Sequence, residues 1–344
     1  FYACLLSASA MLFSCNPDDN NNSNGEDGGT TPQERLSEGI YEPDNKINTV
    51  AYDDFVDEWW SWADRKLDHI AYSDGLSLTL GYDGDYLSTV STVNDDEPVE
   101  ARFFYNSGKL SNYDMYYNNA LALSVNVSHN ASNKISNANI TISDDYINML
   151  MGDFGGMMSL DNLLGKRVSQ SLQNIAKLKS LPSSKFQISD KTVTASYNWE
   201  GDNVVQEIIS ANISIILSAE ELTVLESLFG FEIPDAVMAL LGSSGLPLQF
   251  ALSDTLFYSY DDKKNPYYYC WAEGVTANTL SRNNPLQVSQ SGCESISISM
   301  MGQVIPLQDE PYESVSSVAY TYNDADCPLT IISDGSTKTI TYKE

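Results

Sequence analysis

The sequence predicts a mainly β fold, in which an antiparallel up-and-down meander of hairpins forms one large curved or barrel-like sheet. Three observations favour this class. Polar turns led by an aromatic residue recur along the chain, apolar residues alternate at period two between them, and two internal stretches change to helical spacing. We expect the helical stretches to pack on the concave side of the sheet, because a curved meander leaves one apolar face to be covered.

The aromatic turn is clearest at residues 258–267. Tyr258 and Tyr260 place both rings on one face of a strand, and residues 261–266 supply turn-forming side chains and a proline. A second aromatic strand is expected from Tyr267 to Trp271. The first four units start at residues 41, 62, 82 and 105, so their spacings are 21, 20 and 23 residues, enough for two short strands and two turns.

The N-terminus indicates export. Residues 1–14 are apolar and uncharged but shorter than the roughly 20 residues of a membrane span, which is typical of a signal peptide remnant. Leu12-Phe13-Ser14-Cys15 resembles the bacterial lipobox, in which cleavage exposes a cysteine that then carries lipid. Residues 15–35 are therefore expected to be a lipidated cysteine and a flexible tether rich in Asn, Asp, Gly and Ser, and residues 36–344 a single domain.

From Tyr41 to about Ser143 the pattern predicts strand after strand. Hairpin-type turns at Asp74-Gly75, Asp83-Gly84 and Ser107-Gly108 separate alternating runs. Residues 53–68 fit either one helix or two strands, and the repeat register favours strands. Further strands are expected over residues 191–217 and from Leu248 to the end of the sequence.

Two insertions interrupt the strands. Apolar residues follow helical spacing from Asp145 to Leu181, and a glycine cluster at 152–156 divides this run into two helices. A capping-box pattern at residues 218–221 opens the second insertion, which extends to Leu241.

Charge and cysteine content limit the partners and cofactors. The net charge of −29 argues against nucleic acid as a partner and against charge-driven binding to anionic membranes. Beyond Cys4 and Cys15 the chain has Cys270, Cys293 and Cys327, so at most one disulfide can form among them. The chain contains no CxxC and no cysteine–histidine cluster, so neither a metal site nor a cofactor is expected.

The search for catalytic residues gives no constellation. His69 and His129 are the only histidines, and neither belongs to a nucleophile elbow, a phosphate loop or an HExxH motif. Acidic pairs such as Asp261-Asp262 and Asp309-Glu310 suit glycoside hydrolysis or calcium binding, but solvated turns explain them as well. Exposed rings stack on sugars, whereas alternate rings on strands belong to a core. The candidate glycan-stacking aromatics are Trp59, Trp60, Trp62, Tyr267, Tyr269 and Trp271.

The tyrosine–aspartate hairpins resemble YD (Rhs-type) repeats. The most specific stretches are Tyr260-Asp261-Asp262-Lys263-Lys264-Asn265-Pro266 with Leu280-Ser281-Arg282-Asn283-Asn284-Pro285, and Tyr320-Thr321-Tyr322-Asn323 with Thr341-Tyr342-Lys343-Glu344. With the lipobox, they are similar to an uncharacterised family of Bacteroidetes surface lipoproteins described as having a porin-like β fold. The resemblance implies attachment to the outer membrane through the N-terminal lipid, facing the exterior or the periplasm, and it supplies no catalytic residues.

The sequence therefore predicts a surface-anchored lipoprotein with a non-enzymatic binding or structural role. Its expected partner is a glycan or another surface protein. Two alternatives stay open: an extracellular glycan-acting hydrolase that uses paired carboxylates, and an outer-membrane pore-like protein.

Overall fold

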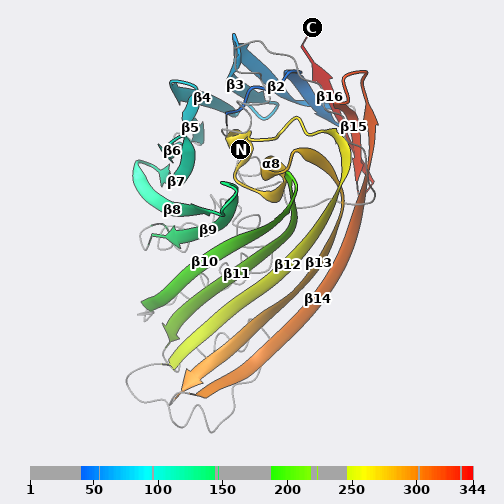
Figure 1. Ribbon diagram of the computed structural model, residues 1–344. Coiled ribbons are helices and arrows are strands. Elements are labelled where there is room, and N and C mark those ends of the chain that lie inside the picture. The colour runs from blue at the N-terminus through cyan, green and yellow to red at the C-terminus, as the bar shows by residue number, and fades with distance from the viewer. Residues whose placement is uncertain are drawn as a thin grey trace.

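The chain closes into a barrel. The computed structural model describes residues 40–53, 55–94, 97–143, 146, 187–217, 223, 246–300, 303–333 and 335–343. Within these ranges sixteen antiparallel strands follow one another around the wall, and β1 pairs with β16 (Figure 1). The predicted mainly β meander is thus confirmed, and its sheet is closed.

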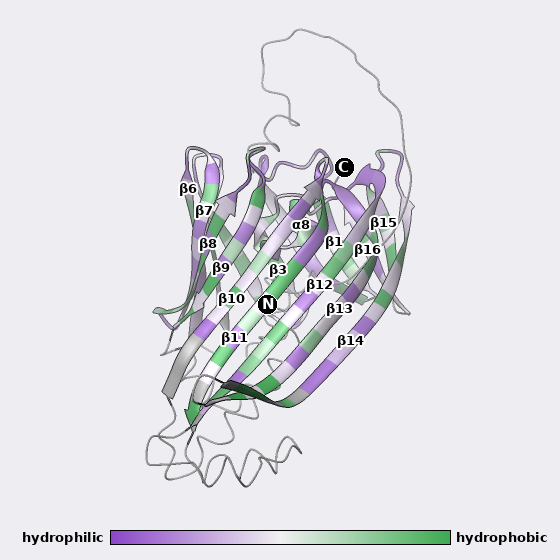
Figure 2. Ribbon diagram, turned by 60° about the horizontal axis from the view of Figure 1, so that its bottom comes forward, coloured by the Kyte–Doolittle hydropathy of each residue, from purple (hydrophilic) through white to green (hydrophobic). Residues whose placement is uncertain are grey.

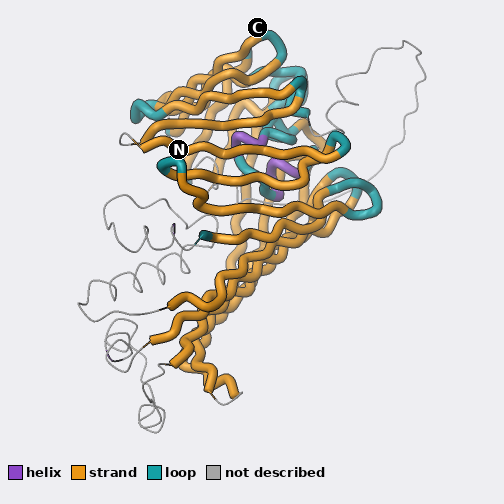
Figure 3. The backbone as a smooth tube through the Cα atoms, turned by 90° about the vertical axis from the view of Figure 1, so that its left-hand side faces the viewer, coloured by secondary structure: helices purple, strands orange, loops and turns teal. Residues whose placement is uncertain are grey.

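The strands differ in length. The strands of six to ten residues are β1 (Ile47–Tyr52), β2 (Phe55–Ala63), β3 (Lys66–Tyr72), β4 (Ser77–Asp83), β5 (Tyr86–Asn94), β6 (Glu97–Asn106), β7 (Lys109–Tyr117), β8 (Ala120–His129), β9 (Ile135–Ile142), β15 (Pro328–Ser333) and β16 (Ser336–Tyr342). The longer strands, of 14 to 20 residues, are β10 (Gln187–Glu200), β11 (Asn203–Leu217), β12 (Leu246–Lys264), β13 (Asn283–Met300) and β14 (Gln303–Tyr322). These long strands run past the short ones and extend one side of the wall (Figure 3).

Residues 53–68, which fitted either a helix or two strands, include all of β2 and the start of β3. The expected insertions at 145–181 and 218–241 fall outside the described residues, apart from Tyr146 and Thr223.

The strand alternation places apolar side chains inside the barrel and polar ones outside. One inner row crosses β4 to β8 through direct cross-strand neighbours, and each member is at most 6% exposed: Leu80, Val90, Ala101, Met115 and Leu123. One outer row crosses β8 to β12 in the same way: Asn126, Asn139, Thr194, Ser210 and Ser253. The interior is therefore a hydrophobic core, and hydroxyl and amide groups form this row of the outer wall. Elsewhere the outer wall also exposes large apolar side chains, among them Phe257, Val304 and Val315 at 48%, 62% and 62%.

A recurring contact accounts for most of the aromatic residues that precede a turn; Tyr105, before the turn from β6 to β7, is an exception, since its OH donates to no carbonyl within the described part of the chain. Trp62 Nε1, Tyr82 OH and Trp199 Nε1 each donate to a carbonyl at the start of the preceding strand, those of Ile47, Leu67 and Ile135, at 2.7, 2.8 and 2.7 Å. A lysine just before each acceptor lies over the same ring, and the three are Lys46, Lys66 and Lys134. Tyr260, Tyr320 and Tyr342 donate equivalently to carbonyls at the starts of β11, β13 and β15.

These contacts lie at one end of the barrel, which we call the clamp rim. Its turns are hydrophilic (Figure 2). A cation–π contact at an exposed site contributes about 0.5–1 kcal/mol, and a hydrogen bond a similar amount. The aromatic spacing of about one hairpin therefore has a structural origin, because these six contacts fasten neighbouring strands to one another at the rim.

One sequence prediction is wrong. Residues 267–271 do not form a strand: the chain turns at 266–269, continues as η1 (Trp271–Glu273), and then forms α8 (Ala277–Leu280). Tyr267, Cys270, Trp271 and Ala272 are all at most 5% exposed. In a strand, Tyr267 and Trp271 would face one side and Cys270 and Ala272 the other, so one pair would point outward. A compact loop inside the barrel buries all four.

Candidate functional site

The loop between β12 and β13, residues 265–282, folds into the barrel at the clamp rim, and we call it the plug (Figures 1 and 3). Asn265 holds it together from within. Its Nδ2 donates to the carbonyls of Asn278 and Ser281 at 2.7 and 2.9 Å, and its Oδ1 accepts from Tyr267 N at 2.9 Å. A buried side chain with its donors and acceptor satisfied in this way fixes one loop conformation.

The plug sits against the seam where β1, β2 and β16 close the barrel. The rings of Tyr267 and Trp60 meet edge to face, with centroids 6.2 Å apart. Lys338 Nζ lies 4.6 Å from the Tyr267 ring and 5.5 Å from the Tyr52 ring. Trp60 Nε1 donates to Glu58 Oε2 at 2.8 Å, so a buried carboxylate of β2 also faces this interface.

Glu273 brings a second carboxyl group to the seam from the plug. Its burial, and then the negative charge of Glu58, raise its pKa to about 8, against the opposing effect of Lys338. Burial alone would lower the pKa of Lys338, but Tyr267, Tyr52 and the two glutamates hold it well above its ordinary value. Lys338 therefore stays charged at neutral pH while most of Glu273 is protonated, which limits the charge buried under the plug.

A second pair of carboxyl groups faces the interior from β11 and β12. Glu207 accepts from Tyr258 OH at 2.7 Å, and Asp254 accepts from the Gln290 side-chain amide. Burial, and then repulsion from Asp254, raise the pKa of Glu207 to about 7, and burial also raises the pKa of Asp254. The two are diagonal neighbours across the strands, which implies Cα atoms about 7–8 Å apart.

Glycoside hydrolysis needs two carboxyl groups that a sugar can reach, and these two are enclosed. Glu207 and Asp254 are 5% and 7% exposed, and side chains of the barrel wall hold both. A sugar cannot reach either carboxyl group without a change in the barrel interior.

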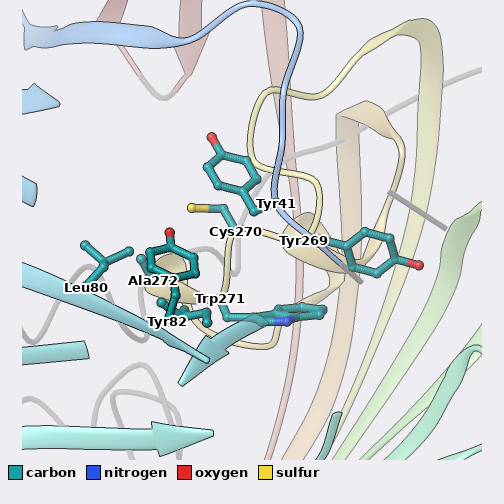
Figure 4. Close-up of a pocket in the computed structure, with 8 residues that line it drawn as sticks. Tyr41, Leu80, Tyr82, Tyr269, Cys270, Trp271 and Ala272 are labelled. Atoms are coloured by element: carbon teal, nitrogen blue, oxygen red, sulfur yellow. The ribbon is translucent and has the colours of Figure 1, made fainter. Parts of the chain in front are cut away.

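A small cavity lies between the plug and the inner wall of β4 and β5 (Figure 4). It is lined by Tyr41, Leu80, Tyr82, Leu87, Tyr269, Cys270, Trp271 and Ala272. Its volume is about 10 Å³, which is too little for an organic ligand. Burial raises the pKa of the Cys270 thiol well above its usual range, and a protonated, enclosed thiol is unreactive.

The aromatics that the sequence suggested for glycan stacking do not share one exposed surface. Trp60, Tyr267 and Trp271 are 2%, 5% and 3% exposed and belong to the core. Trp62 is a clamp-rim residue, and Tyr269 stacks on Tyr268 with centroids 4.1 Å apart. Trp59 is the exposed member, at 42%, on the outer wall. The lipidation candidate Cys15 lies outside the described residues.

A groove on the outer wall does bring chemically suitable groups together. Its floor is one outward row across β4 to β7, in which each residue is the direct neighbour of the next: Thr79, Ser91, Glu100 and Tyr116. Ser77, Pro98 and the turn residues Gly75 and Asn119 also line it, with Thr92 and Val99. Its volume of about 470 Å³ lies in the range of small-molecule sites, which is about 300–1,000 Å³.

Arg102 fixes two groove residues from the side. Its Nε and Nη2 donate to Glu100 Oε2 at 3.0 and 2.6 Å, and its guanidinium lies 4.2 Å from the centroid of the Tyr116 ring. The carboxylate and the ring are thereby held in place before any ligand arrives. We refer to this surface as the outer groove.

The sequence contained the parts of this groove but not their juxtaposition. The signal was the polar half of each alternating strand, such as Glu100 and Arg102 two residues apart on β6. Clustering of aromatics along the chain led instead to residues of the core. Cross-strand register, which assembles the floor row, cannot be obtained from residue spacing alone.

Neither a protein-family model nor a curated protein sequence matches this chain. Among the described residues, none of the helices reaches the length and hydropathy of a membrane span. Within the same ranges, histidine, cysteine, aspartate and glutamate side chains form no group of three or more that could hold a metal ion.

Proposed function

We propose that this chain is a non-enzymatic binding protein that takes its ligand in the outer groove. The floor row of the groove carries the proposal. Two hydroxyls, a carboxylate and a phenol ring line up across four strands, and Arg102 holds the last two in position. The hydroxyl groups can donate to and accept from a polyhydroxylated ligand, the carboxylate can accept from it, and the ring offers an apolar surface with a polar edge.

The hydrolase alternative is less well supported. The neighbouring pair of carboxyl groups, Glu207 and Asp254, is enclosed by core side chains. Of the described residues that line the outer groove, Glu100 is the one that carries a carboxylate, so these residues do not supply an acid–base pair.

The pore alternative conflicts with the polar outer row of β8 to β12. A membrane barrel turns apolar side chains to lipid and polar ones to its lumen. Here the row Asn126, Asn139, Thr194, Ser210 and Ser253 faces outward, while apolar rows fill the inside. Placing that outer row in lipid would strip water from its hydroxyl and amide groups.

We also propose that a lipid on Cys15 displays the barrel at the surface of the outer membrane, as a member of the lipoprotein family that the sequence resembles. The lipobox-like residues 12–15 and the polar tether support this. Metabolic labelling with palmitate is expected to mark the wild-type chain and to be lost in Cys15→Ala. Equal labelling of both chains would refute the anchor.

The helical insertions are proposed to cover the inner face of the long strands. That face is apolar, and Leu248, Ile298 and Ile213 are at most 2% exposed along it. Leu172→Asp, within the first insertion, is expected to abolish the cooperative thermal transition, because it would bury an unpaired charge in the shared core. A variant that keeps its strand circular-dichroism signal and its melting temperature would indicate a separate helical lobe.

The groove itself is tested by Tyr116→Ala. The wild-type chain is expected to bind members of a glycan array, and the variant to lose that binding while its melting temperature stays within a few degrees. Trp59→Ala is the matched control, since it removes an exposed ring from the outer wall of β2. Loss of binding in the control with binding retained in Tyr116→Ala would move the site to β2.

A further inference from the structure

The charges in and beside the outer groove limit the class of glycan that it can bind. We infer that it selects uncharged glycans over glycans that carry carboxylate or sulfate groups. This inference rests on the proposed function, because it assumes that the outer groove is the binding site. Three features of the groove carry it: its hydrogen-bonding groups, the neutralisation of Arg102 and the fixed ring of Tyr116.

The hydrogen-bonding groups suit sugar hydroxyls. Ser77, Thr79 and Ser91 each offer one donor and two acceptor positions, and Asn119 offers both kinds through its amide. Both Arg102 nitrogens bond to the same Glu100 oxygen, Oε2, which leaves Oε1 as an acceptor for a ligand hydroxyl. A hydroxyl can donate to this carboxylate, whereas a ligand carboxylate or sulfate would face it with like charge.

The described residues of the groove also offer no cation that is free to bind an anion. Of the described residues that line it, none is lysine or arginine. Arg102 stands beside the groove, but Glu100 engages it through two nitrogens and the Tyr116 ring through its guanidinium face. The net charge of −29 over the whole chain adds a long-range repulsion against anionic polysaccharides.

Tyr116 provides the apolar contact. The stacked guanidinium holds the ring in one orientation, so a ligand does not have to order it on binding. The C–H face of a pyranose ring matches such a surface, and that contact needs no charge on the ligand.

The inference predicts a specificity change at one residue. Glu100→Gln keeps the side-chain shape, removes the negative charge from the groove and releases the Arg102 guanidinium. Binding of an uncharged oligosaccharide is expected to fall several-fold, while binding of a uronate-containing oligosaccharide is expected to appear and to weaken from low to physiological salt. The control is Glu313→Gln on β14, which removes the same charge from an exposed outer position far along the wall. This variant is expected to leave the binding of both oligosaccharides unchanged.

The experiment is calorimetric titration of the full chain with three probes: an uncharged oligosaccharide series, a polygalacturonate oligomer and a sulfated oligosaccharide. We expect the wild-type chain to bind a member of the uncharged series, and Tyr116→Ala to weaken that binding about tenfold. Preferred binding of an anionic probe, also lost in Tyr116→Ala, would overturn the inference and keep the groove as the site. Absence of any Tyr116-dependent binding, with all variants folded by thermal melting, would overturn both the inference and the proposed function.

Discussion

Trp60→Ala is expected to lower the free energy of unfolding by about 3–5 kcal/mol, the usual cost of removing a buried large aromatic. Trp60 is 2% exposed and packs against Tyr267 of the plug, so its removal leaves a cavity at the seam that closes the barrel. A change of this size corresponds to a melting temperature lower by roughly 10 °C. Trp59, its neighbour in sequence, points outward and is 42% exposed, so Trp59→Ala is expected to cost less than about 1 kcal/mol.

Trp60→Phe separates packing from hydrogen bonding. It keeps an aromatic ring but removes the indole Nε1–H that donates to Glu58. The Glu58 side chain is buried beside residue 60. Loss of a donor to a buried carboxylate costs about 1–3 kcal/mol, so this variant should melt between the wild type and Trp60→Ala. Denaturant unfolding of the four proteins measures the series. Equal stability of Trp59→Ala and Trp60→Ala would show that the seam is not packed as described.

The hairpin pattern was predictable because its signals are local. Tyr82 and the turn that follows it identify a strand end from residue types alone. The contact from Tyr82 to the Leu67 carbonyl spans 15 residues, and equivalent contacts from Trp62 and Trp199 explain why an aromatic residue recurs before these turns. Closure of the barrel, in contrast, has no local signal in the sequence. It depends on Thr49 pairing with Thr341, and no local pattern fixes a register between residues so far apart.

The prediction of a strand over residues 267–271 was wrong for a related reason. The residues 267–271 have the composition of a strand, rich in tyrosine and tryptophan, and propensity alone favours that assignment. Tertiary burial overrides it here, since the end of a sixteen-stranded barrel has room for a loop that packs its rings on all sides. The buried carboxyl groups were missed in the same way, because Glu207 lies on a strand of alternating character and nothing in its spacing distinguishes an inward from an outward glutamate.

The buried carboxyl groups give the barrel a second large and measurable property. The free energy of unfolding is expected to fall as the pH rises from about 4.5 towards 8. Burial raises the pKa of Glu207 from 4.5 to about 7 and that of Glu273 from 4.5 to about 8. Between those values the folded chain binds more protons than the unfolded chain, so each step up in pH favours unfolding. This contribution to stability is complete below the unfolded pKa and is lost as the pH passes the folded one.

Glu207→Gln is the variant that isolates one of these groups. Glutamine keeps the shape and an acceptor for Tyr258 OH but cannot ionise beside Asp254. A pKa displaced from 4.5 to about 7 corresponds to on the order of 3 kcal/mol, so the variant should match the wild type near pH 4.5 and exceed its stability by about that amount at pH 8. Urea unfolding at a series of pH values measures both curves, with Glu313→Gln as the exposed control. Parallel curves for Glu207→Gln and wild type would mean that Glu207 ionises as freely in the folded barrel as in the unfolded chain, and its assignment as a buried neutral carboxyl group would be wrong.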